Sequence, residues 1–441
     1  MKENLKGYIF SRNVKKGFEL KLRKEKMKVV WLTSICPQFI SARLGKPAIA
    51  TGGWLDQSGQ LLHEDGNDLT VIFPSEQGTE RFCDNKIKAY AFKRTYMFHR
   101  NDEELKQTFV EFLKMEAPDV IHIHGTEFPH SYAMTLAAEY LGIRDKCVIS
   151  IQGLVSIYYR HYYAGLPYRI IHRFTIRDLL KRNIYQDAQE FKKRGVTENL
   201  AVKNVDHIIG RTNWDRALSL QMNKNAKYHV CNETLRKSFY SDRWEYDKCI
   251  KHSIFVSQSS YPIKAFHNAL EALLIVLKTY DDAKLYVTGD SPFNTPVYRI
   301  DSYKKYIKDL IVKNNLNDKV VFTGILDEEH MKECYLKTNV FVMCSSIENS
   351  PNSLGEAMIL GVPCVASDVG GISSLFCHEK DGYLYPFDEP YMLAHYICKI
   401  FEKRENQEIT EHAIKHAKKT HNANNNYRML MNIYRTIQGI D

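Results

Sequence analysis

The chain has 441 residues, of which 44% are hydrophobic, 12% aromatic and 26% charged. This composition excludes a disordered, collagen-like or low-complexity chain, and the length predicts about two to three globular domains. The formal charge of +9 is concentrated in residues 1–28 and 160–194, and no stretch reaches the roughly eighteen apolar residues of a membrane-spanning helix, so we expect a cytoplasmic protein.

Apolar strand-like runs alternate with amphipathic helical patterns from Val29 onward. The predicted strands are residues 29–34, 69–73, 120–124, 147–151, 207–210, 254–257, 285–289, 319–322, 340–344 and 364–367. Helices are expected between them, among others at residues 103–114, 130–141, 268–279, 302–313 and 424–439. Apolar strands separated by helices indicate parallel sheets covered on both faces, and hence the α/β class.

A polar segment at residues 240–253 interrupts this alternation, and we place a domain boundary there. The predicted parts are a basic extension (1–26), a Rossmann-like domain (27–245), a second Rossmann-like domain (246–420) and a C-terminal helix that packs back on a domain (421–441). Two doubly wound domains of this kind face each other across a cleft that holds the ligand.

The ten cysteines are scattered singly and show no spacing typical of metal ligands. Four of them lie in or beside apolar strand-like runs, namely Cys36, Cys147, Cys344 and Cys364. We expect these four to be buried free thiols in a reducing compartment.

The most informative segment is residues 348–371, directly after a predicted strand. Gly361 and Pro363 end a short predicted helix that begins near Asn352. A strand–loop–helix turn presents free N–H groups and the positive end of a helix dipole, which suits a phosphate, while Glu348 and Glu356 suit sugar hydroxyls. The alternatives are that Glu356 forms a capping box with Ser353 and that Glu348 is a solvated surface acid.

Two glutamates with seven residues between them, followed by Gly361-Val-Pro363 and by Gly370-Gly371, resemble the donor-site signature of retaining glycosyltransferase family 4, which has the GT-B fold. Segments 261–264, 288–290, 322–326 and 382–384 also match this pattern. The resemblance implies two Rossmann-like domains, an acceptor domain followed by a nucleotide-sugar donor domain.

The resemblance also implies roles for individual residues. Glu356 would bind the ribose, and Glu348 would bind the donor sugar near its reacting face. The N–H groups of Asn352 and Ser353 would meet the diphosphate. The remaining donor-binding positions are Lys264, which would stabilise the leaving diphosphate, and Ile325 and Leu326, whose backbone would meet the base.

One feature departs from the family pattern. A Gly-Arg pair usually precedes the lysine, whereas this chain has Ser257-Gln258-Ser259. The phosphate site would therefore have one fixed cation fewer, which puts the affinity for the donor or its type in doubt.

In the first half, Gly52-Gly53 either forms an ordinary turn or lets the backbone approach a ligand. The resemblance implies that Gly53 meets the donor diphosphate. His122 and His124 share a strand face, and His124 lies nearest the carboxyl end, where ligands bind. A buried structural histidine is the alternative; the resemblance implies His124 beside the donor sugar and leaves His122 structural. Gln152 is expected on the acceptor side.

No metal and no cofactor are expected. The chain has no Asp-x-Asp pair, the usual metal–diphosphate clamp of the other major transferase fold. Lys264, the helix start at Asn352 and the Gly53 N–H can supply the charge stabilisation instead.

A membrane contact is expected from aromatic and basic residues at 158–182. Arg169, Arg173, Arg177 and Lys181 recur at intervals of four, which predicts a cationic stripe along one helix face that meets an anionic bilayer. A solvated basic helix is the alternative, and no recognisable fold supports nucleic-acid binding.

These observations predict an enzyme that transfers a sugar from a nucleotide diphosphate sugar to a hydroxyl of a glycan or lipid-linked acceptor, with retention of configuration. Surface-polysaccharide or lipid-linked glycan synthesis is the setting that the resemblance implies. The alternatives are a nucleotide-sugar epimerase on the same fold and a non-catalytic nucleotide-sugar-binding partner.

Overall fold

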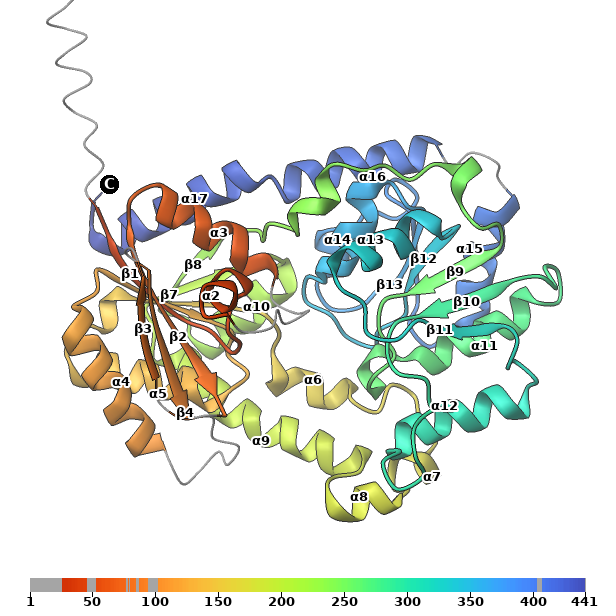
Figure 1. Ribbon diagram of the computed structural model, residues 1–441, viewed down its shortest axis with the longest axis horizontal. Helices are drawn as coiled ribbons and strands as arrows, with labels where there is room; N and C mark the ends of the chain where they lie inside the picture. Colours follow the sequence, from red (N-terminus) through yellow and green to blue (C-terminus); the bar gives the residue numbers. More distant parts are fainter. Residues whose placement is uncertain are drawn as a thin grey trace, which may run out of the picture.

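A computed structural model of the chain shows two α/β domains side by side (Figure 1). It describes residues 26–45, 53–76, 78, 80–84, 87–93, 102–402 and 407–440. The predicted basic extension and Gly52 lie outside the described residues, except for Lys26. The α/β class predicted from the sequence is confirmed.

The first domain contains an eight-stranded sheet of order β3-β4-β2-β1-β5-β6-β7-β8. Its strands are β1 (Lys28–Leu32), β2 (Asp68–Ser75), β3 (Glu80–Asp84), β4 (Ile87–Lys93), β5 (Val120–His124), β6 (Cys147–Ser150), β7 (His207–Gly210) and β8 (Lys227–Val230). All neighbouring strands are parallel except β3 and β4, which pair antiparallel. The chain reverses its direction of winding at β1, so a crevice opens at the carboxyl ends of β1 and β5.

Helices cover both faces of this sheet because alternate strand residues point to opposite sides. Val30 and Leu32 of β1 pack with one group of helices, whereas Val29 and Trp31 pack with the other. The first group is α4 (Asp102–Glu116), α5 (Pro129–Tyr140), α9 (Ile184–Lys203) and α10 (Asn213–Met222). The second group is α2 (Gln38–Arg43), α3 (Gly53–Glu64) and α17 (Ala423–Gln438).

The second domain contains a six-stranded parallel sheet of order β11-β10-β9-β12-β13-β14. Its strands are β9 (Ser253–Val256), β10 (Lys284–Val287), β11 (Val320–Phe322), β12 (Val340–Met343), β13 (Cys364–Ser367) and β14 (Tyr383–Tyr385). One face packs on α11 (Phe266–Val276), α12 (Ser302–Lys313) and α15 (Pro390–Glu402). The other face packs on α13 (Glu328–Lys337), α14 (Asn352–Leu360) and α16 (Gln407–Thr420).

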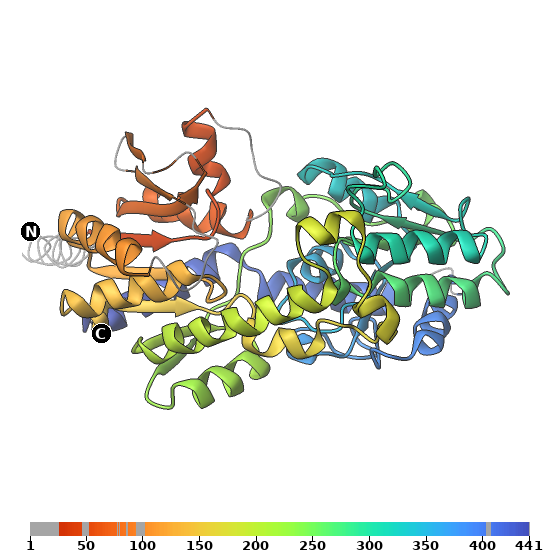
Figure 2. The same ribbon diagram turned by 90° about the horizontal axis from the view of Figure 1, so that it is seen from below.

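Besides the link between β8 and β9, two segments cross between the domains. Below the sheets, α6 (Val155–His161), α7 (Tyr168–Ile171) and α8 (Ile176–Leu180) lead into the long α9 and pack on the second domain (Figures 1 and 2). On the opposite side, α17 leaves the second domain and returns to the first, as Figure 1 shows. Tyr434 of α17 accepts a hydrogen bond from Trp31 and also bonds His122, which anchors this helix to β1 and β5.

Some expectations about elements are wrong. The cationic stripe does not exist, because residues 168–181 form two short helices, α7 and α8, with Arg173 between them and Lys181 after them. The break has a clear cause: Thr175 and Asp178 form a capping box that starts a new helix. Cys36 is only partly buried and lies beyond β1, whereas Cys147, Cys344 and Cys364 are buried free thiols as expected.

Candidate active site between the domains

A cavity of about 490 Å³ lies between the domains, at the carboxyl ends of the strands of the second sheet. Its walls come from α3, from the segment that links the two sheets, and from the loops after β9, β10, β11 and β12. The residues predicted for donor binding that line it are Gly53, Lys264, Leu326, Glu348, Asn352, Ser353 and Glu356.

The helix α14 begins at Asn352 and ends at Leu360, and its C-cap residue Gly361 adopts a left-handed conformation with φ 81°. Pro351 occupies the N-cap position and makes no side-chain cap, so the first N–H groups of the helix can meet an anion in the cavity. The capping-box alternative is wrong. Glu356 does not return to the helix start but pairs with Arg236.

Lys264 and Glu348 form an ion pair on the cavity wall, with 2.5 Å between Nζ and Oε1. Ser345 donates a second hydrogen bond to the same carboxylate oxygen at 2.7 Å. Burial would lower the pKa of Lys264, but the carboxylate of Glu348 raises it overall, so the ammonium group stays charged. Glu348 is buried, which excludes the alternative that it is a solvated surface acid.

Arg236 is a cavity residue that sequence reasoning missed. It lies in the segment between β8 and β9, and its guanidinium donates two hydrogen bonds of 2.7 Å to the two oxygens of Glu356. Burial raises the pKa of Glu356, and the guanidinium opposes this shift. Arg236 therefore brings a fixed cation into the cavity from a segment far from the place where the family pattern has its arginine.

The opposite wall is formed by the start of α3. A Cβ atom at Gly53 would lie 2.7 Å from Cγ of Arg236, so only glycine leaves room for this arginine. Trp54 lies beside it and lines both this cavity and a smaller one of about 50 Å³.

His124 and Gln152 line the smaller cavity and not the large one. The ring of His124 stacks on His122 at 3.8 Å and contacts Trp31 edge-on, while its Nε2 atom has no hydrogen-bond partner among the described residues. Burial, with smaller contributions from His122 and Arg211, lowers the pKa of His124 well below its ordinary value, so the ring is neutral. The side chain of His122 forms hydrogen bonds with Ser150 of β6 and Tyr434 of α17, so it joins β5 to both elements.

Hydrogen bonds connect the two domains beside these cavities. Glu233 of the first domain accepts one bond from Gln152 of its own domain and one from Asn352 of the second, at 2.8 and 2.9 Å. The buried Asn349 accepts from Thr212 and donates to Asp215 of the first domain. The loop that carries Glu348 is thereby fixed to both domains.

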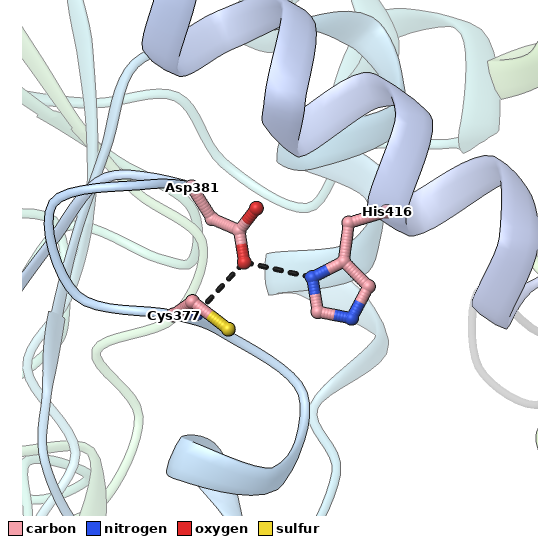
Figure 3. A group of neighbouring side chains, drawn as sticks. All are labelled: Cys377, Asp381 and His416. Atoms are coloured by element: carbon pink, nitrogen blue, oxygen red, sulfur yellow. Dashed lines mark hydrogen bonds and ion pairs between the residues drawn. The ribbon is translucent and has the colours of Figure 1, made fainter.

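Three potential metal ligands lie together away from the cavity, with Cys377, Asp381 and His416 offering atoms within 4.8 Å of one another (Figure 3). His416 Nδ1 lies 2.7 Å from Asp381 Oδ2. Two ligands of one tetrahedral zinc ion lie about 3.3 Å apart, given bonds of about 2.0 Å. The backbone N–H of Cys377 donates to the same oxygen, and His412 bonds the other one. The geometry is that of a hydrogen-bonded cluster that joins α16 to the turn before β14.

Residues 244–420 match the model of the family described as glycosyl transferases group 1. Among curated proteins, N-acetyl-alpha-D-glucosaminyl L-malate synthase of Bacillus anthracis is 23% identical over 289 residues, which span 64% of this chain and 65% of that protein. An uncharacterized glycosyltransferase of Methanocaldococcus jannaschii is 29% identical over 137 residues, 31% of this chain and 32% of that protein. The chain thus covers less than two thirds of the length of either relative.

Solved structures match over nearly the whole chain. Sucrose-phosphate synthase from Thermosynechococcus elongatus has a TM-score of 0.67 and 16% identity, covering 94% of this chain and all of that one. Anabaena Alr3699/HepE, solved in complex with UDP and glucose, has a TM-score of 0.63 and 15% identity, covering 92% of this chain and 99% of that one. The fold is therefore GT-B.

Proposed function

We propose that this chain, whose second domain matches the group 1 glycosyl transferases, transfers a sugar from a nucleotide diphosphate sugar to an acceptor hydroxyl with retention of configuration. The observation that carries this proposal is the cavity between the domains. It combines an uncapped helix start with two cation–carboxylate pairs, Lys264 with Glu348 and Arg236 with Glu356.

In this proposal the diphosphate lies at the start of α14, between Lys264 and the opposite wall at Gly53. The N–H groups of Asn352 and Ser353 and the Lys264 ammonium stabilise the negative charge that grows on the leaving diphosphate. Glu356 binds the ribose, and Arg236 beside it supplies the cation that the family pattern would place before Lys264. No metal ion takes part.

Glu348 lies at the donor sugar, and the smaller cavity receives the acceptor side, so the place proposed for His124 differs from the position beside the donor sugar that the resemblance implies. The Nε2 atom of His124 and the Nε1 atom of Trp54 are both buried there without a partner among the described residues, and sugar hydroxyls would satisfy them. The setting is surface-polysaccharide or lipid-linked glycan synthesis. Among the relatives, an amylovoran biosynthesis glycosyltransferase of Erwinia amylovora and an alpha-monoglucosyldiacylglycerol synthase of Streptococcus pneumoniae support it.

The test is a product assay with a panel of nucleotide sugars, beginning with UDP-glucose because one structural neighbour, Anabaena Alr3699/HepE, was solved with it. Glycosyl transfer releases the nucleotide diphosphate, and slow hydrolysis without an acceptor would already identify the donor. NMR of the product anomer tests retention, and full activity in excess EDTA is expected. Epimerised sugar still attached to the nucleotide, no turnover of any donor, or inhibition by EDTA that magnesium reverses would each contradict the proposal.

A further inference from the structure

The protrusion formed by α7 and α8 exposes an unusual number of large apolar side chains. Tyr168 is 77% exposed, Leu179 73% and Leu180 84%, and Phe174 and Ile176 are at least half exposed. With the exposed cations Arg169, Lys181 and Arg182, these residues define the α7–α8 patch. In Figure 1 it forms the lower margin of the molecule, beneath α6 and α12.

The helix α8 turns its acidic residue, Asp178, inward and its three apolar residues outward. Asp178 is buried and accepts hydrogen bonds from Thr175 at its own helix start and from the backbone N–H of Ser302 at the start of α12. Ile176, Leu179 and Leu180 of the same helix are exposed. A soluble surface helix has the opposite arrangement, so something other than water is expected to cover this face.

The protrusion is firmly held, which shows that its exposed side chains do not result from a loose segment. Arg173 pairs with Asp309 of α12 at 2.9 Å, and His267 of α11 bonds the carbonyl of Ala164 at 2.7 Å. Ile170 and Ile184 are buried in the core of the second domain. One side of the segment thus packs against the second domain, and the α7–α8 patch is the opposite side, which faces solvent.

The net charge of the patch is positive. Residues 167–187 contain five arginines and lysines against two acids, Asp178, which is buried, and Asp187, which pairs with Arg182 at 2.9 Å. The neighbouring helix α12 contributes Lys304, Lys305 and Lys308 and one acid, Asp309, which pairs with Arg173. Two copies of such a surface would repel each other in a symmetric dimer. Nucleic acid would satisfy the cations but leave the leucines in water.

We propose that the α7–α8 patch binds the surface of an anionic lipid bilayer. Leu179, Leu180 and Phe174 enter the boundary between headgroups and acyl chains, while Arg169 and Lys181 contact lipid phosphates. The contact is peripheral, since no helix among the described residues is long and apolar enough to cross a membrane. This apolar and basic patch replaces the single cationic stripe predicted from the sequence.

The experiment measures sedimentation of the full chain with vesicles of phosphatidylglycerol and phosphatidylcholine in equal parts. We expect the wild type to bind, and the double variant Leu179→Glu/Leu180→Glu to bind about a hundredfold more weakly at any salt concentration. Arg169→Gln/Lys181→Gln should weaken binding mainly at low salt, where charges are least screened. Val297→Glu serves as the matched control, because Val297 is 74% exposed on the second domain outside the patch.

Both leucines are solvent-exposed, so the double variant should keep the wild-type melting temperature and far-UV circular dichroism. Donor affinity, which depends on the distant cavity, should also be unchanged. Failure of the wild type to bind the vesicles, or equal binding by the double variant, would overturn the proposal. So would light scattering that shows a wild-type dimer converted to a monomer by the leucine substitutions, since the patch would then be an interface between copies.

Discussion

Glu348 and Glu356 lie in one cavity but have different partners, Lys264 and Arg236 respectively. We expect Glu348→Gln to lower kcat about a hundredfold with little change in donor affinity, because it removes charge only where the sugar reacts. Glu356→Gln should instead raise the donor KM about tenfold through a lost ribose hydrogen bond. Steady-state kinetics measures both, with the exposed Glu408→Gln as control. An effect of both variants on the same parameter would refute this division of roles.

Arg236 supplies the second test at this scale. Arg236→Lys keeps a positive charge but loses the bidentate hydrogen bond to Glu356. We expect UDP or another donor nucleotide to bind this variant about tenfold more weakly, as measured by calorimetry. Arg236→Met should weaken binding further, by up to about a hundredfold. The double variant Arg236→Met/Glu356→Gln removes the unpaired buried carboxylate and separates lost binding from lost stability.

Arg299→Met, at an exposed arginine of the second domain, should bind the nucleotide like the wild type. Unchanged affinity in Arg236→Lys and Arg236→Met would show that Arg236 only neutralises Glu356 in the empty cavity.

The sequence predicted the cavity residues that lie in segments matching the family pattern, namely Gly53, Lys264, Leu326 and residues 348–356, and missed Arg236, which lies in none of them. The segment around Glu348 and Glu356 is continuous, so its resemblance to the donor-site signature predicts one carboxylate in the loop before α14 and the other inside that helix. Arg236 is 120 positions from Glu356 and lies in an irregular segment. No periodicity or motif identifies such a residue in a sequence. Arg236 reaches the cavity only because the linking segment packs against Gly53 in the folded chain.

Gly370 supports the loop of Glu348. A Cβ atom at Gly370 would overlap the carbonyl oxygen of Glu348, and the residue has φ 54°. Gly370→Ala should therefore displace the loop, lowering kcat at least about tenfold and the free energy of unfolding by about 1–3 kcal/mol. Gly439→Ala is the matched control, since φ there is 70° but nothing lies near the added atom. It should lose about 1 kcal/mol and keep wild-type kcat. Equal kcat in both variants would contradict the supporting role of Gly370.

The cluster around Asp381 should act as a clamp on α16. Asp381→Asn loses bonds to His412 and His416, and we expect the free energy of unfolding at pH 6 to fall by about 1–3 kcal/mol. Although burial raises the pKa of Asp381, bonds from His416, the Cys377 N–H and His412 lower it overall. The wild-type advantage should therefore be present above the unfolded pKa of 3.8 and disappear below it.

Urea unfolding of the wild type and Asp381→Asn from pH 6 to pH 3 measures this difference, with the exposed Asp388→Asn as control. Zinc should leave the melting temperature unchanged. A rise with zinc that Cys377→Ser abolishes would show that the cluster binds metal.

At the scale of elements, ten of the fourteen strands in the described part of the chain were predicted, and three of the four missed strands lie at sheet edges. The predicted strands at residues 120–124, 207–210 and 364–367 have the observed limits, because continuous apolar runs mark them. The strands β3, β4, β8 and β14 were missed. Three of them, β3, β8 and β14, are short and lie at sheet edges, whereas β4 is an interior strand whose apolar run is interrupted by Lys88. The helix break between α7 and α8 was missed because a four-residue repeat of cations concealed the capping signal of Thr175.

At the scale of the whole molecule, three segments connect the two domains: the α6–α9 segment, the link before β9, and α17. Because the residues that line the cavity come from both domains, the cavity exists only while the domains stay close. Gly53 belongs to the first domain, whereas Lys264 and α14 belong to the second. Under the proposed function, any closure between the domains is therefore coupled to donor binding.

Asn349 is the residue best placed to test this coupling, since its side chain is buried and bonds Thr212 and Asp215 across the domains at 2.7 and 3.0 Å. Asn349→Ala should leave each domain folded but loosen their contact. We expect a larger radius of gyration in small-angle scattering without donor. Donor binding should be about tenfold weaker, because part of the free energy of binding is then used to bring the two domains together. The exposed Asn317→Ala should change neither quantity. Weaker binding with an unchanged radius of gyration would mean that Asn349 acts locally on the Glu348 loop and not on the domain arrangement.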